Sequence, residues 1–109
     1  MHPDRQRKIR ELFDEYIEMY AGRDDRLTEH FSQNFSGYPG SGSRLIKDRE
    51  EWVRITRQDF AQVPGRIRME LLDLHLQDLC DDVVVVTAFF HIHLPSGGDY
   101  FSTKVVRLT

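Results

Sequence analysis

Residues 81–95 read DDVVVVTAFFHIHLP. The run from Val83 to Phe90 is rich in β-branched and aromatic side chains, which pack well on a pleated surface. This composition predicts a long strand. Both faces of the strand are apolar over its first half, so neighbouring elements must cover it on two sides. We therefore expect this strand to lie at the centre of the fold.

Composition favours one small globular domain. The chain has 109 residues and a formal charge of −3, which suits a single core. It lacks the clustered basic excess of a nucleic-acid-binding protein and the long apolar run of a membrane span. Cys80 is the single cysteine, which leaves no internal disulfide and favours a reducing compartment. With no apolar leader near Met1, a cytoplasmic location is expected.

Three segments carry helical signals. The first is predicted at residues 3–21, because Pro3 and Gly22 are natural end points and one set of apolar side chains recurs at helical spacing. That set is Ile9, Leu12, Phe13, Tyr16, Ile17 and Tyr20. A short second helix can begin at residue 24 or 25. Asp48 and Glu51 have the form of a capping box and predict a third helix that ends near Val63.

The third helix places a carboxylate in an apolar stripe. The predicted buried stripe is Trp52, Ile55, Phe60 and Val63, with Val53 at its margin. Thr56 and Asp59 fall within the same stripe. A carboxylate that points at a core is costly unless it has a partner or a wet pocket. Asp59 is therefore expected either to pair with a group such as Arg66 or to have a functional role.

Residues 66–78 predict a second long strand whose buried face changes along its length. Ile67, Met69 and Leu71 share one face, whereas Leu72, Leu74 and Leu76 share the other. Either a bulge lies at Leu71–Leu72, or a twisted strand is buried on opposite faces at its two ends. A tight turn after Leu79 would pair residues whose numbers sum to about 161. In that register Asp73 and His75 lie on the same face as Leu71.

The order of elements predicts an α+β fold. Ser96-Gly97-Gly98 makes a second hairpin turn into a third strand at residues 99–108. Three helices would then pack on one face of a curved antiparallel sheet, which closes over the first helix as a cone-shaped barrel with an internal pocket. The third strand leaves an exposed edge, which a further strand or a partner is expected to cover.

Several strings of the sequence resemble one known family. They are the first helix with Tyr16 and Tyr20, and residues 31–37, 49–60 and 82–94. Together they resemble the SnoaL-like domain of the nuclear transport factor 2-like superfamily, which has the cystatin-like α+β fold. They are also similar to modules that precede bacterial diguanylate cyclase or histidine kinase domains. The resemblance implies one more strand, so residues 1–109 are expected to be a single domain that lacks its last strand.

The candidate site consists of polar and aromatic residues that could converge on the pocket. The candidate catalytic residues are Asp59, Asp73 and His75, as groups able to move a proton in an apolar environment. The alternative for Asp73 and His75 is the solvated side of a half-buried strand. The candidate ligand-binding residues are Tyr16, Tyr20, Tyr38, Trp52, Thr56, Met69 and Phe90.

His91 and His93 form a second constellation. Alternate strand residues face the same side, and Glu70 is predicted opposite His91, so two imidazoles and a carboxylate could in principle hold a metal ion. Ordinary cross-strand hydrogen bonds are the favoured interpretation, because the Arg68 guanidinium nearby opposes a cation. No metal and no cofactor are assigned.

Three functions remain open from the sequence. The favoured hypothesis is a dimerising, ligand-binding or sensory module for a small apolar molecule, with a homodimer formed through the sheet. The first alternative is a small isomerase, cyclase or hydratase that uses Asp59 or Asp73 as base and His75 or a tyrosine as donor. The second alternative is a purely structural dimerisation module.

Overall fold

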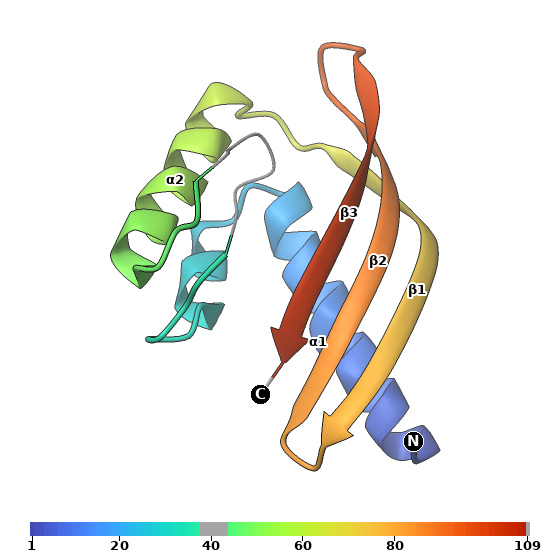
Figure 1. Cartoon of the computed structure of the whole chain (residues 1–109). Helices are drawn as coiled ribbons and strands as arrows, with labels where there is room; N and C mark the ends of the chain where they lie inside the picture. Colours follow the sequence, from blue (N-terminus) through green and yellow to red (C-terminus); the bar gives the residue numbers. More distant parts are fainter. Residues whose placement is uncertain (38–43, 109) are drawn as a thin grey trace.

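The computed structural model describes residues 1–37 and 44–108 and confirms the α+β fold. Helix α1 lies across the inner face of a curved sheet, and the short 3-10 helix η1 and helix α2 stand beside α1 (Figure 1). The elements are α1 (Pro3–Ala21), η1 (Asp25–His30), α2 (Arg49–Gln62), β1 (Arg68–Cys80), β2 (Val83–His93) and β3 (Asp99–Leu108).

The helices begin where capping residues satisfy their first backbone amides. Asp24 accepts from the Arg26 amide at the start of η1, and Asp48 accepts from the Glu50 amide at the start of α2. Side-chain oxygens at this position satisfy amides that have no partner within the helix. The predicted cap at Asp48 is thus confirmed, and of the two predicted candidates, Asp24 and Asp25, it is Asp24 that caps η1. Glu51, however, pairs with Arg44 instead of completing a capping box.

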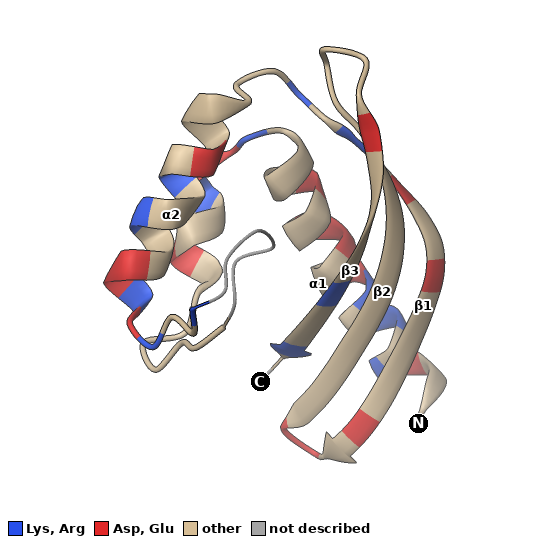
Figure 2. Ribbon diagram, turned by 45° about the horizontal axis from the view of Figure 1, so that its top comes forward, with Lys and Arg blue, Asp and Glu red and all other residues tan. Residues whose placement is uncertain are grey.

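The sheet is an antiparallel meander with β2 in the middle. The strand order is β1-β2-β3, and the β2–β3 hairpin turns at Gly97, whose φ of 97° favours glycine. β2 contains no Asp, Glu, Lys or Arg, whereas charges of both signs are spread along β1 and α2 (Figure 2). This distribution fits the predicted central position of β2.

The register of β1 against β2 changes at Leu72. Partners sum to 161 from Arg68↔His93 to Leu71↔Phe90, as predicted, but Asp73 pairs with Phe89. Leu72 is the extra residue of a β-bulge, which was one of the two predicted alternatives. The bulge shifts the pairs from Asp73 to Asp78 by one position, so Leu74, opposite Ala88, points inward, and a second irregularity follows between Asp78 and Cys80. The expectation that Asp73 and His75 face the interior is wrong, because the register used for it did not include this shift.

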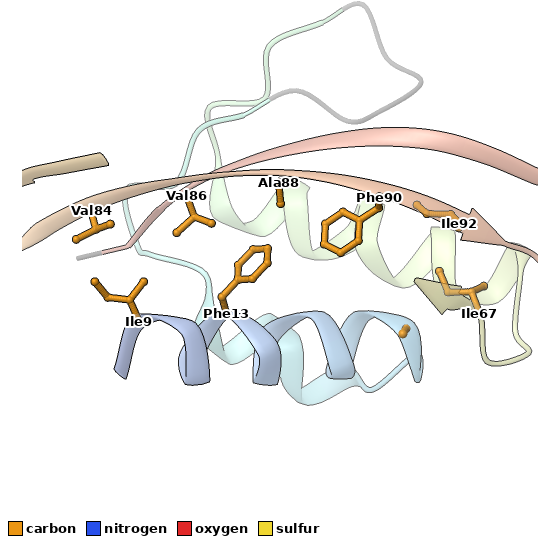
Figure 3. Packing of buried hydrophobic residues seen from close by; sticks show 9 residues of the cluster. Ile9, Phe13, Ile67, Val84, Val86, Ala88, Phe90 and Ile92 are labelled. Atoms are coloured by element: carbon orange, nitrogen blue, oxygen red, sulfur yellow. The ribbon is translucent and has the colours of Figure 1, made fainter. Parts of the chain in front are cut away.

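The main core lies between α1 and the inner face of β2. Ile9 and Phe13 of α1 point toward a row of alternate β2 side chains (Figure 3). The Phe13 and Phe90 rings stack with centroids 6.2 Å apart. The β2 row consists of Val84, Val86, Ala88, Phe90 and Ile92. Leu12 was assigned to the same helix face, but its side chain is 48% exposed.

A second core cluster joins α1, η1 and α2. It contains Met19, Leu27, Phe31, Val53 and Phe60. Val53 is buried and Trp52 only partly so, which places the buried stripe of α2 one residue away from its predicted centre. In the described residues no helix is long and apolar enough to cross a membrane.

Candidate functional site

Five polar side chains gather where the C-terminal end of α1, helix α2 and the inner face of β3 meet. Tyr20 donates from its hydroxyl to Oδ2 of Asp59 at 3.2 Å. The Arg23 guanidinium lies 3.7 Å from the same oxygen. Tyr100 and Lys104 extend the group from β3, since they face the same side as the buried residues Ile92 and Ala88. We refer to Tyr20, Arg23, Asp59, Tyr100 and Lys104 as the inner polar cluster.

Arg23 holds the cluster together through contacts with both helices. It has a positive φ of 57°, which is unfavourable for a residue with a Cβ and turns the chain sharply after α1. Its side chain is only 7% exposed, and its Nε donates to the Val63 carbonyl at 3.0 Å. The guanidinium lies about 5 Å from the centroids of the Tyr20 and Phe60 rings, a distance at which cation–π attraction operates. These contacts tie the ends of α1 and α2 together.

Lys104 brings a positive charge to the inner face of the sheet. It pairs with Ala88 in the register, and its Nζ lies 4.3 Å from the centroid of the Tyr20 ring. Burial lowers the pKa of the Lys104 ammonium, and the Asp59 charge opposes this shift. In residues 1–37 and 44–108 no carboxylate oxygen lies within 4 Å of Lys104 Nζ. Lys104 is therefore a partly buried cation without a carboxylate in direct contact among the described residues.

The tyrosines of the cluster remain protonated at neutral pH. Burial, followed by the Asp59 charge, raises the pKa of Tyr20 to about 12. The same two causes raise the pKa of Tyr100. Both hydroxyl groups can therefore donate hydrogen bonds. The cluster as a whole offers two cations, one carboxylate and two neutral donors.

The structure brings together only part of the predicted site. Tyr20 and Asp59 meet, but the partners of Asp59 are Tyr20 and Arg23, and Arg66 pairs with Glu18 instead. Tyr16 packs against the second core cluster, and burial raises its pKa. Trp52 packs against Phe35 and Phe31, and Thr56 is buried on α2.

The remaining predicted residues lie away from this group. Met69 packs on the main core, and Phe90 is covered by Phe13. Asp73 and His75 are exposed and share the outer face of the sheet with Phe89 and Thr87, their register partners. Tyr38 lies outside the described residues.

Arg23, Tyr100 and Lys104 were missed by sequence reasoning. Charged residues are usually solvated, and nothing near Arg23 in the sequence indicates a buried guanidinium. For β3 a signal existed: hairpin pairing with β2 places Tyr100, Ser102, Lys104, Val106 and Leu108 on the face that carries Ala88 and Phe90. The alternation along β3 could therefore have identified Lys104.

Two surface depressions lie outside the candidate site. One, of about 440 Å³, is lined by the start of α1 and by Leu74 and Leu76. The other, of about 610 Å³, is lined by residues of α1 and η1 together with Arg66. Neither depression is lined by a member of the inner polar cluster, although Gly22 and Asp24, which flank Arg23 in the sequence, line the second one. The internal pocket therefore stays a prediction.

Comparison with known proteins places this architecture in a family. A family model for the SnoaL-like domain matches residues 9–109. No curated protein sequence matches the chain.

Three solved structures have the same fold. An NTF2-like protein of unknown function from Pseudomonas putida has a TM-score of 0.86 at 13% identity, over 98% of this chain and 77% of that chain. Aln2 from Streptomyces has a TM-score of 0.74 at 13% identity, over 98% and 79%. The beta subunit of the benzoate 1,2-dioxygenase from Burkholderia mallei has a TM-score of 0.70 at 12% identity, over 91% and 76%. At these identities the likeness concerns the fold, and the match to the family model shows that the chain belongs to the SnoaL-like domain family.

Proposed function

We propose that this domain binds a small, mainly apolar molecule that carries one acidic group, at the inner polar cluster. The observation that carries the proposal is the partly buried Lys104 ammonium, which lies over the Tyr20 ring without a carboxylate in contact. Withdrawing a cation from water is costly unless it is paired. An acidic ligand would supply the missing anion.

The surroundings of Lys104 suit such a ligand. Asp59 and Tyr100 are partly exposed, so solutes can reach the cluster from outside. The rings of Tyr20 and Phe60, which meet edge to face at 5.9 Å, offer an apolar surface beside the charge. Asp59 is already engaged by Tyr20 and Arg23, which leaves Lys104 as the main attraction for an anion. Sites of this kind combine an apolar lining with a few placed polar groups.

The test compares acids with their neutral analogues. Phenylacetate and octanoate would be titrated into the full chain by calorimetry, with the two corresponding amides as controls. We expect the acids to bind at least about tenfold more tightly than the amides, because only the acids pair with Lys104. Lys104→Met should abolish this preference and Lys104→Arg should retain it. Lys8→Met, at an exposed position of α1, should change nothing. Equal binding of acids and amides would refute the proposal.

One hydrogen bond in the cluster favours an alternative function, catalysis by proton transfer. The hydrogen bond from Tyr20 to Asp59 joins a possible proton donor to a possible base. We would follow exchange of the α-hydrogens of phenylacetone in deuterated water by NMR. Exchange that disappears in Asp59→Asn, while the affinity for phenylacetate is kept, would favour proton transfer. Absence of exchange above the buffer rate would leave binding as the function. Asp73 and His75 have no part in either version, because they lie on the outer face.

We also propose that a second copy of the chain covers the outer face of the sheet. The face exposes apolar side chains at Leu72, Phe89, Phe101 and Val105, and the last two are more than 60% exposed. Arg68 and Arg107 share it with Glu70 and Asp73, so two copies related by a two-fold axis can pair opposite charges. Sedimentation velocity should show a dimer that Val105→Glu converts to a monomer. A monomeric wild-type chain at 100 μM would overturn this part.

A further inference from the structure

Three side chains on the outer face bring metal-binding atoms close to one another. Glu70 stands on β1, opposite His91 of β2, and His93 follows two residues later on the same face. One ligand atom from each of these residues lies within 4.8 Å of the other two. The imidazole rings have centroids 4.0 Å apart, and Phe101 stacks on His91 at 4.5 Å. The backbones of the three residues are therefore held at a fixed spacing by strand pairing, and ring packing orients His91 and His93.

The contact with Asp99 shows which ring nitrogen of His91 carries a hydrogen. His91 Nε2 lies 2.9 Å from Oδ2 of Asp99. A carboxylate only accepts hydrogen bonds, so Nε2 is the nitrogen that carries the hydrogen. In the neutral ring Nδ1 then has a free electron pair, and it lies 3.7 Å from Oε1 of Glu70. A carboxylate that orients an imidazole in this way is the usual second partner of a histidine that binds a metal ion.

The contact with Arg68 shows which ring nitrogen of His93 has a free electron pair. The guanidinium nitrogen of Arg68 lies 3.0 Å from His93 Nε2. A guanidinium has no acceptor, so His93 Nε2 must accept and cannot carry a hydrogen. This nitrogen lies 3.9 Å from the same Glu70 oxygen. With His91 in its neutral form, Glu70, His91 and His93 thus place three acceptor atoms close to one another with no hydrogen between them.

We propose that Glu70, His91 and His93 form a binding site for a divalent transition-metal ion of the Zn²⁺ class. Acceptor atoms that face one another repel unless a proton or a metal cation lies between them, and three such atoms around one point suit a metal ion better than a single proton. Ligands at zinc distances of about 2.1 Å stand about 3.4 Å apart in a tetrahedron. The separations of 3.7 and 3.9 Å from Glu70 therefore need to close by only about 0.3 and about 0.5 Å. The two histidine nitrogens, which lie within 4.8 Å of each other, need to close by at most about 1.4 Å. Two imidazoles and one carboxylate suit zinc, nickel or copper, whereas calcium and magnesium prefer oxygen. Water would complete the coordination.

Arg68 should weaken this site, because its charge lies beside the metal position. On binding, the guanidinium must release His93 Nε2 and turn away from the ion, and its exposed position in the single chain leaves room for this movement. Replacing Arg68 by glutamine removes the competing cation. We therefore expect Arg68→Gln to bind zinc several-fold more tightly than the wild-type chain. A merely structural role of the histidines does not predict this gain.

The test uses the full chain without a purification tag, after removal of metal with a chelator. Zinc would be titrated against a chromophoric chelator, and cobalt would report the geometry through its visible absorption. We expect one zinc per chain, and a loss of affinity of at least about tenfold in His91→Ala, His93→Ala and Glu70→Gln. Asp99→Asn should lose about 10- to 100-fold, the range found for such second partners. Circular dichroism of the metal-free variants would confirm that each is folded.

His75→Ala is the matched control. His75 is exposed on the same outer face of β1 and pairs with Thr87, outside the three-residue site. Its replacement should leave the zinc affinity unchanged. Unchanged affinity in His91→Ala and His93→Ala, or an equal loss in His75→Ala, would place any bound zinc elsewhere and overturn the proposal. A wild-type chain that binds no zinc at 100 μM would overturn it as well.

Discussion

Replacing Phe13 by alanine should remove a large part of the stability of the domain. Phe13 is 1% exposed, stacks on Phe90 and fills the space between α1 and β2. Truncation of a buried phenylalanine costs about 3 to 5 kcal/mol, which includes the cavity left behind. A domain of this size has a free energy of unfolding of about 5 to 15 kcal/mol. The variant should therefore be folded but much less stable.

Leu12→Ala is the matched control for this prediction. Leu12 precedes Phe13 in α1, but its side chain is 48% exposed. Alanine is also the better helix former, so the loss should stay below about 1 kcal/mol. Sequence reasoning assigned both side chains to the buried face, and only the structure separates them.

Urea unfolding followed by circular dichroism would measure both variants. With a slope of about 2 kcal/mol per molar urea, the midpoint of Phe13→Ala should fall by roughly 2 M. The midpoint of Leu12→Ala should change by less than about 0.5 M. The hollow made in Phe13→Ala should also admit benzene and gain stability from it, as apolar cavities do. Equal losses in the two variants would show that α1 is rotated relative to the arrangement described above.

Three further predictions follow from single features. The pKa of Tyr20 in the folded state, about 12, exceeds its ordinary value of 10.0, so the contribution of this hydroxyl to the free energy of unfolding is complete below pH 10 and is lost as the pH rises through 12. Tyr20→Phe should lack this loss in unfolding measurements between pH 9 and 12. A pH profile identical to that of the wild-type chain would contradict the assignment. Deletion of Leu72, the extra residue of the bulge, should keep Leu74 on the inner face and cost less than about 2 kcal/mol in urea unfolding, whereas loss of the folded state would show that the bulge itself is required. Asp48→Ala should cost about 1 kcal/mol through the lost cap of α2, and no change in the melting temperature would argue against that cap.

The elements could be predicted because their signals are local. Pro3 and the stop at Gly22 give α1 its observed bounds, and Asp48 caps α2. The order of strands followed from two short turns. The face of each element was harder to predict. A bulge at Leu72 reverses which side Asp73 faces, and the pairing that decides this involves residues far apart in the sequence.

Only those residues of the candidate site that lie on helices could be predicted from the sequence. Tyr20 and Asp59 were both placed on inward faces, and they meet. Arg23 could not be predicted, because its burial depends on a positive φ and on the Val63 carbonyl, which is brought near by the packing of α2. The alternation of residues along β3 does place Lys104 on the inner face, but only after β3 has been aligned with β2.

The two proposed sites share strands but occupy opposite faces of the sheet. Consecutive strand residues point to opposite sides, so Asp99 supports His91 on the outer face while Tyr100 belongs to the inner polar cluster. The inner site depends on Lys104 of β3 and on the helices, whereas the outer site takes all three ligands from β1 and β2. No side chain belongs to both. Lys104→Met should therefore leave zinc binding intact, and His91→Ala should leave acid binding intact, so each variant tests whether a loss at the other site is specific or reflects a damaged sheet.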